Sequence, residues 1–235
     1  MREQPRDRAP DADAIEQRFK LPMVRLSRGA VLGGLCLAKW TLRVDWTATG
    51  LEHVRGLVPP FILASNHTSH IDTHAILDSL PRRIRERTAV AAAFDYFGDS
   101  ENNLRGKVLQ FVVASAWHAF GFERGKAPLR SLRAASQLLS RGWCLLLYPE
   151  GTRSRSGEMA TFRPGLAVVT RLARRPVVPV HVSGGRGVLP EGVWIPKSGC
   201  VRVRFGSPLM MEPDESAPEF TERVEVAVRQ LAAES

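Results

Sequence analysis

FILASNHTSHID, residues 61 to 72, is the stretch that decides the fold. Its first four residues are apolar and are typical of a buried strand. Two polar residues end that strand, and Thr68 or Ser69 is then suited to N-cap a helix that carries Ile71 and further apolar residues. The stretch therefore predicts a strand, a short turn and a helix. A histidine lies on the turn, and a carboxylate lies in the first turn of the helix.

The spacing of His67 and Asp72 indicates a general base. Two residues five apart on one regular helix point about 140° away from each other, so His67 can reach Asp72 only from the turn before the helix. A carboxylate behind an imidazole fixes its tautomer, leaves the other nitrogen free and stabilises the cation that forms on protonation. We therefore expect a base at the carboxyl end of a strand, where open α/β sheets keep their sites.

Length, composition and charge limit the class of protein. The 235 residues are enough for one sizeable α/β domain with a full core, and the hydrophobic fraction of 44% fits a globular chain. The formal net charge of +9 favours anionic partners such as nucleic acid, acidic lipid surfaces or phosphorylated substrates. Cys36, Cys144 and Cys200 are scattered without a CxxC pair, which indicates a reducing compartment and no disulfide framework. Cys36 and Cys144 have apolar neighbours, so we expect both to be buried.

The N-terminal region divides into two segments. Residues 1 to 14 are expected to form a disordered leader without a secretory signal, because they are charged and contain proline. Residues 15 to 43 are expected to be a helical segment, interrupted at Pro22 and at Gly33-Gly34. Its most apolar part, residues 29 to 42, is too short to span a membrane. An amphipathic helix in a headgroup layer and one packed on the domain both fit this pattern.

Residues 44 to 235 predict a single α/β domain with a mostly parallel central sheet flanked by helices. Apolar runs and alternating segments indicate the strands, and helical periodicity between them indicates the connections. The expected strands are 42–47, 61–64, 88–93, 143–148, 177–182 and 201–205, and the expected helices in this domain are 70–80, 104–119, 128–140, 164–173 and 220–233.

Four short segments downstream are candidate parts of a ligand site. FERG, residues 122 to 125, places Arg124 in a Gly-flanked turn that can present its planar fork to a phosphate. YPEGTRS, residues 148 to 154, ends a strand at a proline, and its Gly151 lets backbone amides approach an anion that Arg153 could bind. FRPG, residues 162 to 165, places Arg163 at a helix start, and VVPVHV, residues 177 to 182, is an apolar strand.

Together these blocks resemble, in order and in sequence, the motifs of the glycerolipid acyltransferases, the group of 1-acylglycerol-3-phosphate acyltransferase. NHTSHID resembles the family's N-H-x-x-x-x-D block, and YPEGTRS resembles F-P-E-G-T-R-S with a tyrosine first. The resemblance implies that His67 is the base and that Asp72 orients it. It also implies a set of residues that hold the substrate phosphate, namely Arg124, Glu150, Gly151, Thr152 and Arg153, and a secondary set, namely Asn66, Ser69 and Arg163.

The resemblance implies acyl transfer from acyl-CoA or acyl-carrier protein to a lysophospholipid, by default 1-acylglycerol-3-phosphate, giving phosphatidic acid. Another lysophospholipid, a lyso-ornithine lipid or a specialised acceptor would need much the same blocks. No metal or other cofactor is implied. The resemblance favours the headgroup-layer interpretation of the N-terminal helix, with the protein peripheral on the anionic cytoplasmic face of a membrane.

Three other classes of function are less well supported. His67, His70, Asp72 and His74 lie within eight residues, but their spacing does not match the H-x-H-x-D-H of metallo-hydrolases. A nucleic-acid-binding module is suggested only by the charge, since the 33 lysines and arginines are spread out with no aromatic-studded basic motif. A serine hydrolase would need a G-x-S-x-G elbow, and the sequence has none.

Overall fold

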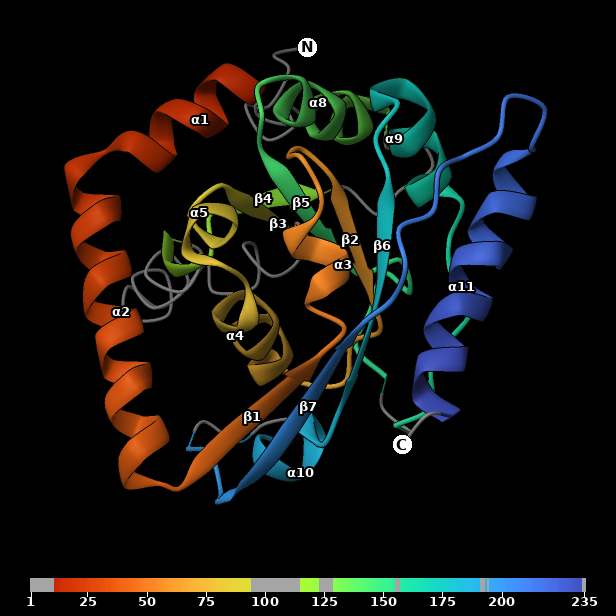
Figure 1. The fold of residues 1–235 in the computed structure, drawn as a ribbon. Coiled ribbons are helices and arrows are strands. Elements are labelled where there is room, and N and C mark those ends of the chain that lie inside the picture. Colours follow the sequence, from red (N-terminus) through yellow and green to blue (C-terminus); the bar gives the residue numbers. More distant parts are fainter. Residues whose placement is uncertain are drawn as a thin grey trace, which may run out of the picture.

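The computed structural model describes residues 11–93, 115–122, 129–154, 157–190, 193 and 195–233. Its centre is a seven-stranded sheet in the order β1-β7-β6-β2-β5-β3-β4 (Figure 1). Paired strands are parallel except that β7 runs antiparallel to β6. The predicted mostly parallel α/β sheet is therefore confirmed. The strands are β1 Val44–Thr49, β2 Ile62–Ser65, β3 Thr88–Ala93, β4 Ala119–Phe122, β5 Cys144–Leu147, β6 Val177–Ser183 and β7 Gly199–Phe205.

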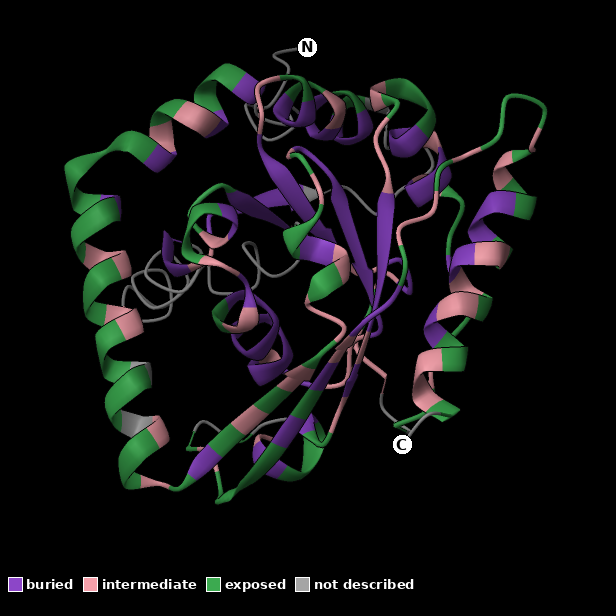
Figure 2. Cartoon of the chain, viewed as in Figure 1, coloured by how far each residue is buried: buried purple, intermediate pink, exposed green. Residues whose placement is uncertain are grey.

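Helices cover both faces of this sheet, as the alternating direction of the strand side chains requires. In β2, Ile62 and Ala64 face one hydrophobic cluster, whereas Leu63 faces the other. The first cluster is covered by α1 Ala12–Lys20, α8 Leu129–Ser140, α9 Gly165–Ala173 and α11 Ala217–Ala233. The second is covered by α3 Glu52–Arg55, α4 His70–Ser79, α5 Arg82–Arg85 and α10 Gly185–Val188. The central strands β2 and β5 are buried along their whole length, and Figure 2 shows them within the interior.

The N-terminal helices differ in part from the expectation. Helix α1 begins at Ala12, three residues before the predicted start, because Ala12 is itself buried against the core. Helix α2, Pro22–Thr41, continues through Gly33-Gly34 without the predicted interruption. The break at Pro22 is confirmed, and the axes of α1 and α2 differ there by 66°. No single helix among the described residues has the length and apolarity to cross a membrane; only the bent pair α1 and α2, taken together, reaches that length and composition.

Two further expectations are corrected. Strand β4 lies partly where the sequence predicted the end of a helix over residues 104–119, because Ala119 and Phe120 pair with β3 and Phe120 is fully buried. The rest of that predicted helix lies mostly outside the described residues. Cys36 is exposed on α2 rather than buried, whereas Cys144 is buried in β5 as expected. Burial raises the pKa of the Cys144 thiol to about 11, which makes this cysteine unreactive.

The docking of α1 gives a stability prediction. Phe19 is 4% exposed, and its ring centroid lies 4.7 Å from that of His118 and 5.1 Å from that of Trp143. Phe19→Ala should lower the free energy of unfolding by about 3 kcal/mol, because it leaves a cavity in the core. Met23→Ala, at a side chain that is 64% exposed, is the control and should change that energy by less than about 0.5 kcal/mol. Urea unfolding measures both, and identical midpoints for the two variants would show that α1 does not belong to the core.

Candidate active site

The turn between β2 and α4 brings His67 and Asp72 together as the spacing predicts. His67 Nδ1 lies 3.3 Å from Asp72 Oδ2, with the histidine on the turn and the aspartate in the first turn of α4. Ser69 is the N-cap, with extended backbone, and its side chain accepts from the Ile71 amide. The Asp72 side chain is fully buried, whereas the His67 side chain remains 15% exposed. The buried Asp72 carboxylate therefore holds the imidazole, while part of the histidine side chain remains accessible to solvent.

The Asp72 carboxylate is fixed by the backbone before the helix. Its Oδ2 accepts from the amides of Thr68 and Ser69, each at 2.7 Å, and from Thr68 Oγ1 at 3.2 Å. These bonds form a capping box with the Ser69 side chain at the positive end of the helix dipole. A carboxylate held in this way can orient His67 with the imidazole proton on Nδ1 and a lone pair on Nε2.

The His67 ring is also fixed by a stacked tyrosine. The ring centroids of His67 and Tyr148 lie 3.9 Å apart with an interplanar angle of 18°. The Tyr148 hydroxyl lies 2.7 Å from Thr73 Oγ1, which anchors the tyrosine to α4. Burial, together with the Asp72 charge, raises the pKa of Tyr148 well above its ordinary value. Tyr148 therefore stays neutral and packs against the base without competing with it for a proton.

Glu150 has a different role from the phosphate-binding one expected from the sequence. Its Oε1 accepts from the His67 backbone amide at 2.7 Å, and its Oε2 accepts from the Ala160 amide at 2.8 Å. The residue is only 3% exposed, and burial raises the pKa of its carboxyl group. On the other side of the turn, the Ser154 amide donates to the His67 carbonyl oxygen at 2.8 Å. The segment after β5 therefore positions the main chain of His67.

Asn66 and Ser69, the two secondary residues on this turn, also position it. The Asn66 side chain donates to the Val182 carbonyl oxygen at 2.9 Å and accepts from the Val182 amide at 2.7 Å, which continues the β2–β6 ladder beyond the strand. Ser69 Oγ donates to the Leu189 carbonyl oxygen at 2.6 Å. Both residues are buried, so they act on the site through the backbone.

The expected anion-binding residues lie beside this turn on accessible surface. Gly151 has φ +75°, and a Cβ placed there would lie 2.8 Å from Arg163 Nε. Thr152 is exposed and Arg153 is half-buried, with its Nη1 2.9 Å from His70 Nε2. Burial and the Arg153 charge lower the pKa of His70 to about 4, so this histidine is neutral and can accept from the guanidinium. Arg124, the remaining predicted phosphate-binding residue, lies outside the described residues.

The residues that suggested a metal site do not converge. His67 faces Asp72, His70 contacts Arg153, and His74 packs edge-on against Trp46 on another side of α4. Within the described parts of the chain, no group of three histidine, cysteine or carboxylate side chains is placed to hold a metal ion. The arrangement instead supports acid–base chemistry at one imidazole.

Comparison with known proteins agrees with this site. Residues 46–183, more than half of the chain, match the family described as Acyltransferase. The chain belongs to the Acyltransferase family. The resemblance noted from the sequence motifs is thereby confirmed, and the matched region includes every predicted site residue.

Individual relatives and one solved structure show which members of the family this chain is similar to. Over 170 aligned residues it is 26% identical to the chloroplastic 1-acyl-sn-glycerol-3-phosphate acyltransferase LPAT1 of Arabidopsis thaliana. The alignment covers 68% of this chain and 42% of that protein. It is 29% identical to the 1-acyl-sn-glycerol-3-phosphate acyltransferase of Pseudomonas aeruginosa over 112 residues, 46% of this chain and 43% of that protein. The chain thus spans less than half the length of each of these relatives. The crystal structure of PlsC from Thermotoga maritima shares the fold, with a TM-score of 0.65 and 24% identity over 94% of this chain and 87% of that one.

The structure adds two residues to this acyltransferase-family site that the sequence analysis missed: Tyr148, which stacks on His67, and Gly185. Gly185 begins α10 directly after β6, and a Cβ built on it would lie 2.0 Å from Asp72 Oδ1. Only a glycine therefore lets α10 close over the carboxylate. The signal in the sequence was the pair Gly184-Gly185 after a strand, which the sequence analysis did not connect with Asp72.

This contact predicts a difference between two glycines of one short helix. Gly185→Ala should lower the free energy of unfolding by about 1–3 kcal/mol, because the new methyl group overlaps a buried carboxylate. Gly187→Ala is the matched control, since a Cβ there meets nothing within 4 Å, and it should leave stability unchanged or slightly raised. Urea unfolding of both variants tests the assignment, and equal stabilities would mean that Asp72 is not confined by α10.

Proposed function

We propose that the protein transfers an acyl group from an acyl thioester to the free hydroxyl of 1-acylglycerol-3-phosphate, giving phosphatidic acid. The observation that carries the proposal is the His67–Asp72 pair, with Nδ1 near the carboxylate and the histidine side chain 15% exposed. The names of the Arabidopsis and Pseudomonas relatives support the choice of acceptor. Acyl-CoA and acyl-carrier protein are both suitable donors, because each offers the same activated thioester.

In the proposed reaction His67 acts as a general base. Its Nε2 removes the proton of the acceptor hydroxyl while the oxygen attacks the thioester carbonyl carbon. Asp72 stabilises the imidazolium through Nδ1. The carbon–sulfur bond then breaks, and the thiolate leaves with the proton that His67 returns. The thioester is already activated, so the alcohol attacks it directly, no acyl-enzyme is needed and no metal enters the scheme.

The acceptor phosphate is proposed to bind beside this base. Arg153 supplies charge next to the His67 turn, and Gly151 and Thr152 provide accessible backbone in the same loop. Arg163 packs over Gly151 and adds a second guanidinium. Arg124 is proposed to complete this group on the strength of the family motif alone. A cluster of arginines suits a phosphate because the planar forks bind its oxygens in pairs.

The protein is proposed to act as a peripheral protein on the cytoplasmic face of an anionic membrane. Figure 2 shows that most of helix α2 is exposed. Its exposed residues include large apolar ones, with Leu26 76% and Trp40 81% exposed. Arg25 lies on the same helix and is exposed. An apolar face beside basic residues suits a helix at the headgroup boundary, where the acceptor lipid resides.

Acyl transfer from a labelled long-chain acyl-CoA, with and without 1-acylglycerol-3-phosphate, tests this function. The parent should form phosphatidic acid only when the acceptor is present. His67→Ala should abolish turnover, and Asp72→Asn should lower kcat by roughly 10²–10⁴-fold, because the imidazole loses its orientation and charge support. His53→Gln, on α3 and outside the site, is the control and should keep full activity.

Two results would contradict parts of this proposal separately. Undiminished turnover by folded His67→Ala would refute the base assignment. A folded parent that forms no phosphatidic acid, with either acyl-CoA or acyl-carrier protein as donor, would refute 1-acylglycerol-3-phosphate as the acceptor.

A further inference from the structure

The first residue of α4 is a histidine to which the proposed reaction gives no role. His70 lies three positions after the base His67, and its Nε2 is 2.9 Å from Nη1 of Arg153. Arg153 is the residue that is proposed to supply charge to the acceptor phosphate. His70 therefore connects the turn that carries the base with the side chain that is proposed to bind the substrate.

The contact between His70 and Arg153 has only one possible direction. A guanidinium keeps its charge and offers only N–H donors, so the bond requires a lone pair on His70 Nε2. The neutral ring then carries its proton on Nδ1. Burial, and then the Arg153 charge, lower the pKa of His70 to about 4, so the ring stays neutral near pH 7 and keeps this acceptor. His70 is thus suited to hold Arg153 rather than to exchange protons near neutral pH.

The backbone beside Arg153 is fixed to the same turn. The amide of the next residue, Ser154, donates to the His67 carbonyl oxygen at 2.8 Å. Ser154 Oγ in turn accepts from the Gly157 amide at 3.0 Å. These bonds fix the start of the Arg153 side chain relative to the base, and the contact with His70 fixes its guanidinium. Both ends of the side chain are therefore placed by groups of one small region.

Holding a long side chain before the substrate arrives favours binding. An arginine that is ordered only by its ligand loses rotamer entropy on binding, and a preorganised one avoids that loss. The bond to His70 uses one of the five N–H donors of the guanidinium, so the group keeps a capacity for phosphate oxygens. A neutral imidazole also orients the guanidinium without adding a negative charge beside the phosphate, as a carboxylate in its place would.

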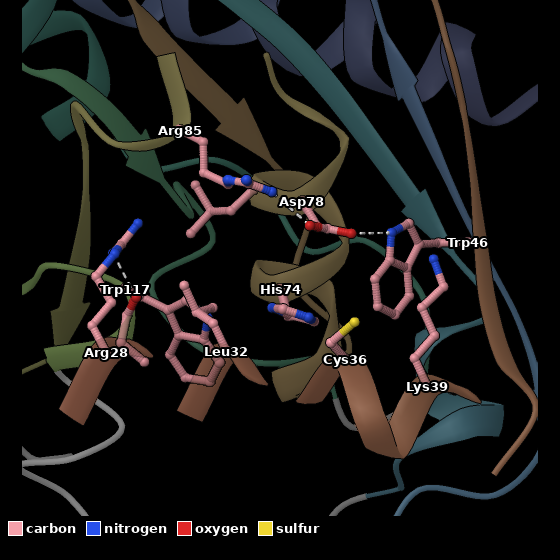
Figure 3. Close-up of a pocket in the computed structure, with 11 residues that line it drawn as sticks. Arg28, Leu32, Cys36, Lys39, Trp46, His74, Asp78, Arg85 and Trp117 are labelled. Carbon is pink, nitrogen blue, oxygen red and sulfur yellow. Dashed lines mark hydrogen bonds and ion pairs between the residues drawn. The ribbon is translucent and has the colours of Figure 1, made fainter. Parts of the chain in front are cut away.

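The start of α4 does not need the His70 side chain for its own stability. Ser69 and Asp72 already form a complete capping box there. The other histidine of this helix has different surroundings, since His74 packs edge-on against Trp46 and lines a cavity with residues of α2 (Figure 3). The two histidines of one helix therefore offer a matched comparison, with one on Arg153 and the other away from it.

We propose that His70 is a positioning residue that orients Arg153 toward the phosphate of the acceptor. The inference rests on the proposed function and assigns the recognition of the phosphate to a pair of residues, the arginine and the histidine that holds it. Since His70 acts on Arg153, its loss should weaken binding of the acceptor and leave the chemical step at His67 unchanged.

Acceptor titrations at saturating acyl-CoA test this assignment. His70→Leu should raise the KM for 1-acylglycerol-3-phosphate about 3- to 10-fold, the effect expected when the ligand itself must order an arginine. It should leave kcat within about twofold of the parent and the KM for acyl-CoA unchanged. His70→Gln keeps an acceptor oxygen and should lie closer to the parent than His70→Leu. His74→Leu is the matched control and should keep the parent KM for both substrates.

A double-mutant cycle shows whether His70 acts through Arg153. Arg153→Gln alone should raise the acceptor KM about 10- to 100-fold, because a charged donor to the phosphate is lost. Adding His70→Leu to Arg153→Gln should change that KM by less than about twofold, since the group that His70 orients is gone. The dissociation constant of 2-deoxy-1-acylglycerol-3-phosphate, which lacks the reacting hydroxyl, should change by the same factors in each variant.

Several results would overturn this inference. The first is a parent-like acceptor KM in His70→Leu, and the second is an equal effect of His70→Leu with and without Arg153→Gln. A defect in His70→Gln as large as that in His70→Leu would show that the acceptor atom does not matter. A fall in kcat with the acceptor KM unchanged would place His70 with the base, and a rise in the KM for acyl-CoA alone would place Arg153 on the donor.

Failure of the proposed function would be recognised separately. In that case the parent itself would form no phosphatidic acid. Binding of 2-deoxy-1-acylglycerol-3-phosphate to the parent and to the same variants would still decide the inference, because it needs no turnover. A dissociation constant that His70→Leu leaves unchanged would overturn it there as well.

Discussion

A fully buried carboxylate at the start of α4 is the constraint on which the rest of this site depends. Burying a charge is costly unless hydrogen bonds compensate for lost hydration, and two backbone amides and a hydroxyl supply them to Asp72. Those donors exist only because Thr68 and Ser69 are placed where the turn enters the helix. The same geometry leaves His67 one residue earlier, at the correct distance to share the carboxylate. The Asp72 carboxylate thus both completes the helix cap and orients the base.

The order of the strands explains why distant segments meet at this turn. Strand β2 lies between β5 and β6 and is parallel to both, so the segments after all three strands emerge at one edge. The segment after β5 provides Glu150, which accepts a hydrogen bond from the His67 amide. The segment after β6 provides Gly185, whose missing side chain leaves room for the Asp72 carboxylate. The reactive histidine is therefore held by three neighbouring strand ends, and its ring is supported by Tyr148.

The sequence was most informative where local patterns determine the structure. The apolar runs of β2 and β5 and the capping signal at Thr68 or Ser69 depend on neighbouring residues, and all three were predicted; the structure selects Ser69 as the cap. The buried role of Glu150 depends on the backbone of His67, which is 83 positions away, so its charge suggested a ligand contact instead. The need for a glycine at position 185 likewise depends on the packing of α10 against Asp72, which the local sequence does not show. The short strand β4 was missed because it has only four residues and its pairing partner β3 is distant in the sequence.

The central claim is that Asp72 holds His67 with its proton on Nδ1 and leaves Nε2 free to act as a base. Nitrogen-15 NMR of the labelled His67 side chain near neutral pH measures this directly, with His67→Gln to assign the signals. The account predicts a protonated Nδ1 and a bare Nε2 in the parent, and a mixture of tautomers in Asp72→Asn. A proton on Nε2 in the parent, or a spectrum that Asp72→Asn leaves unchanged, would contradict it.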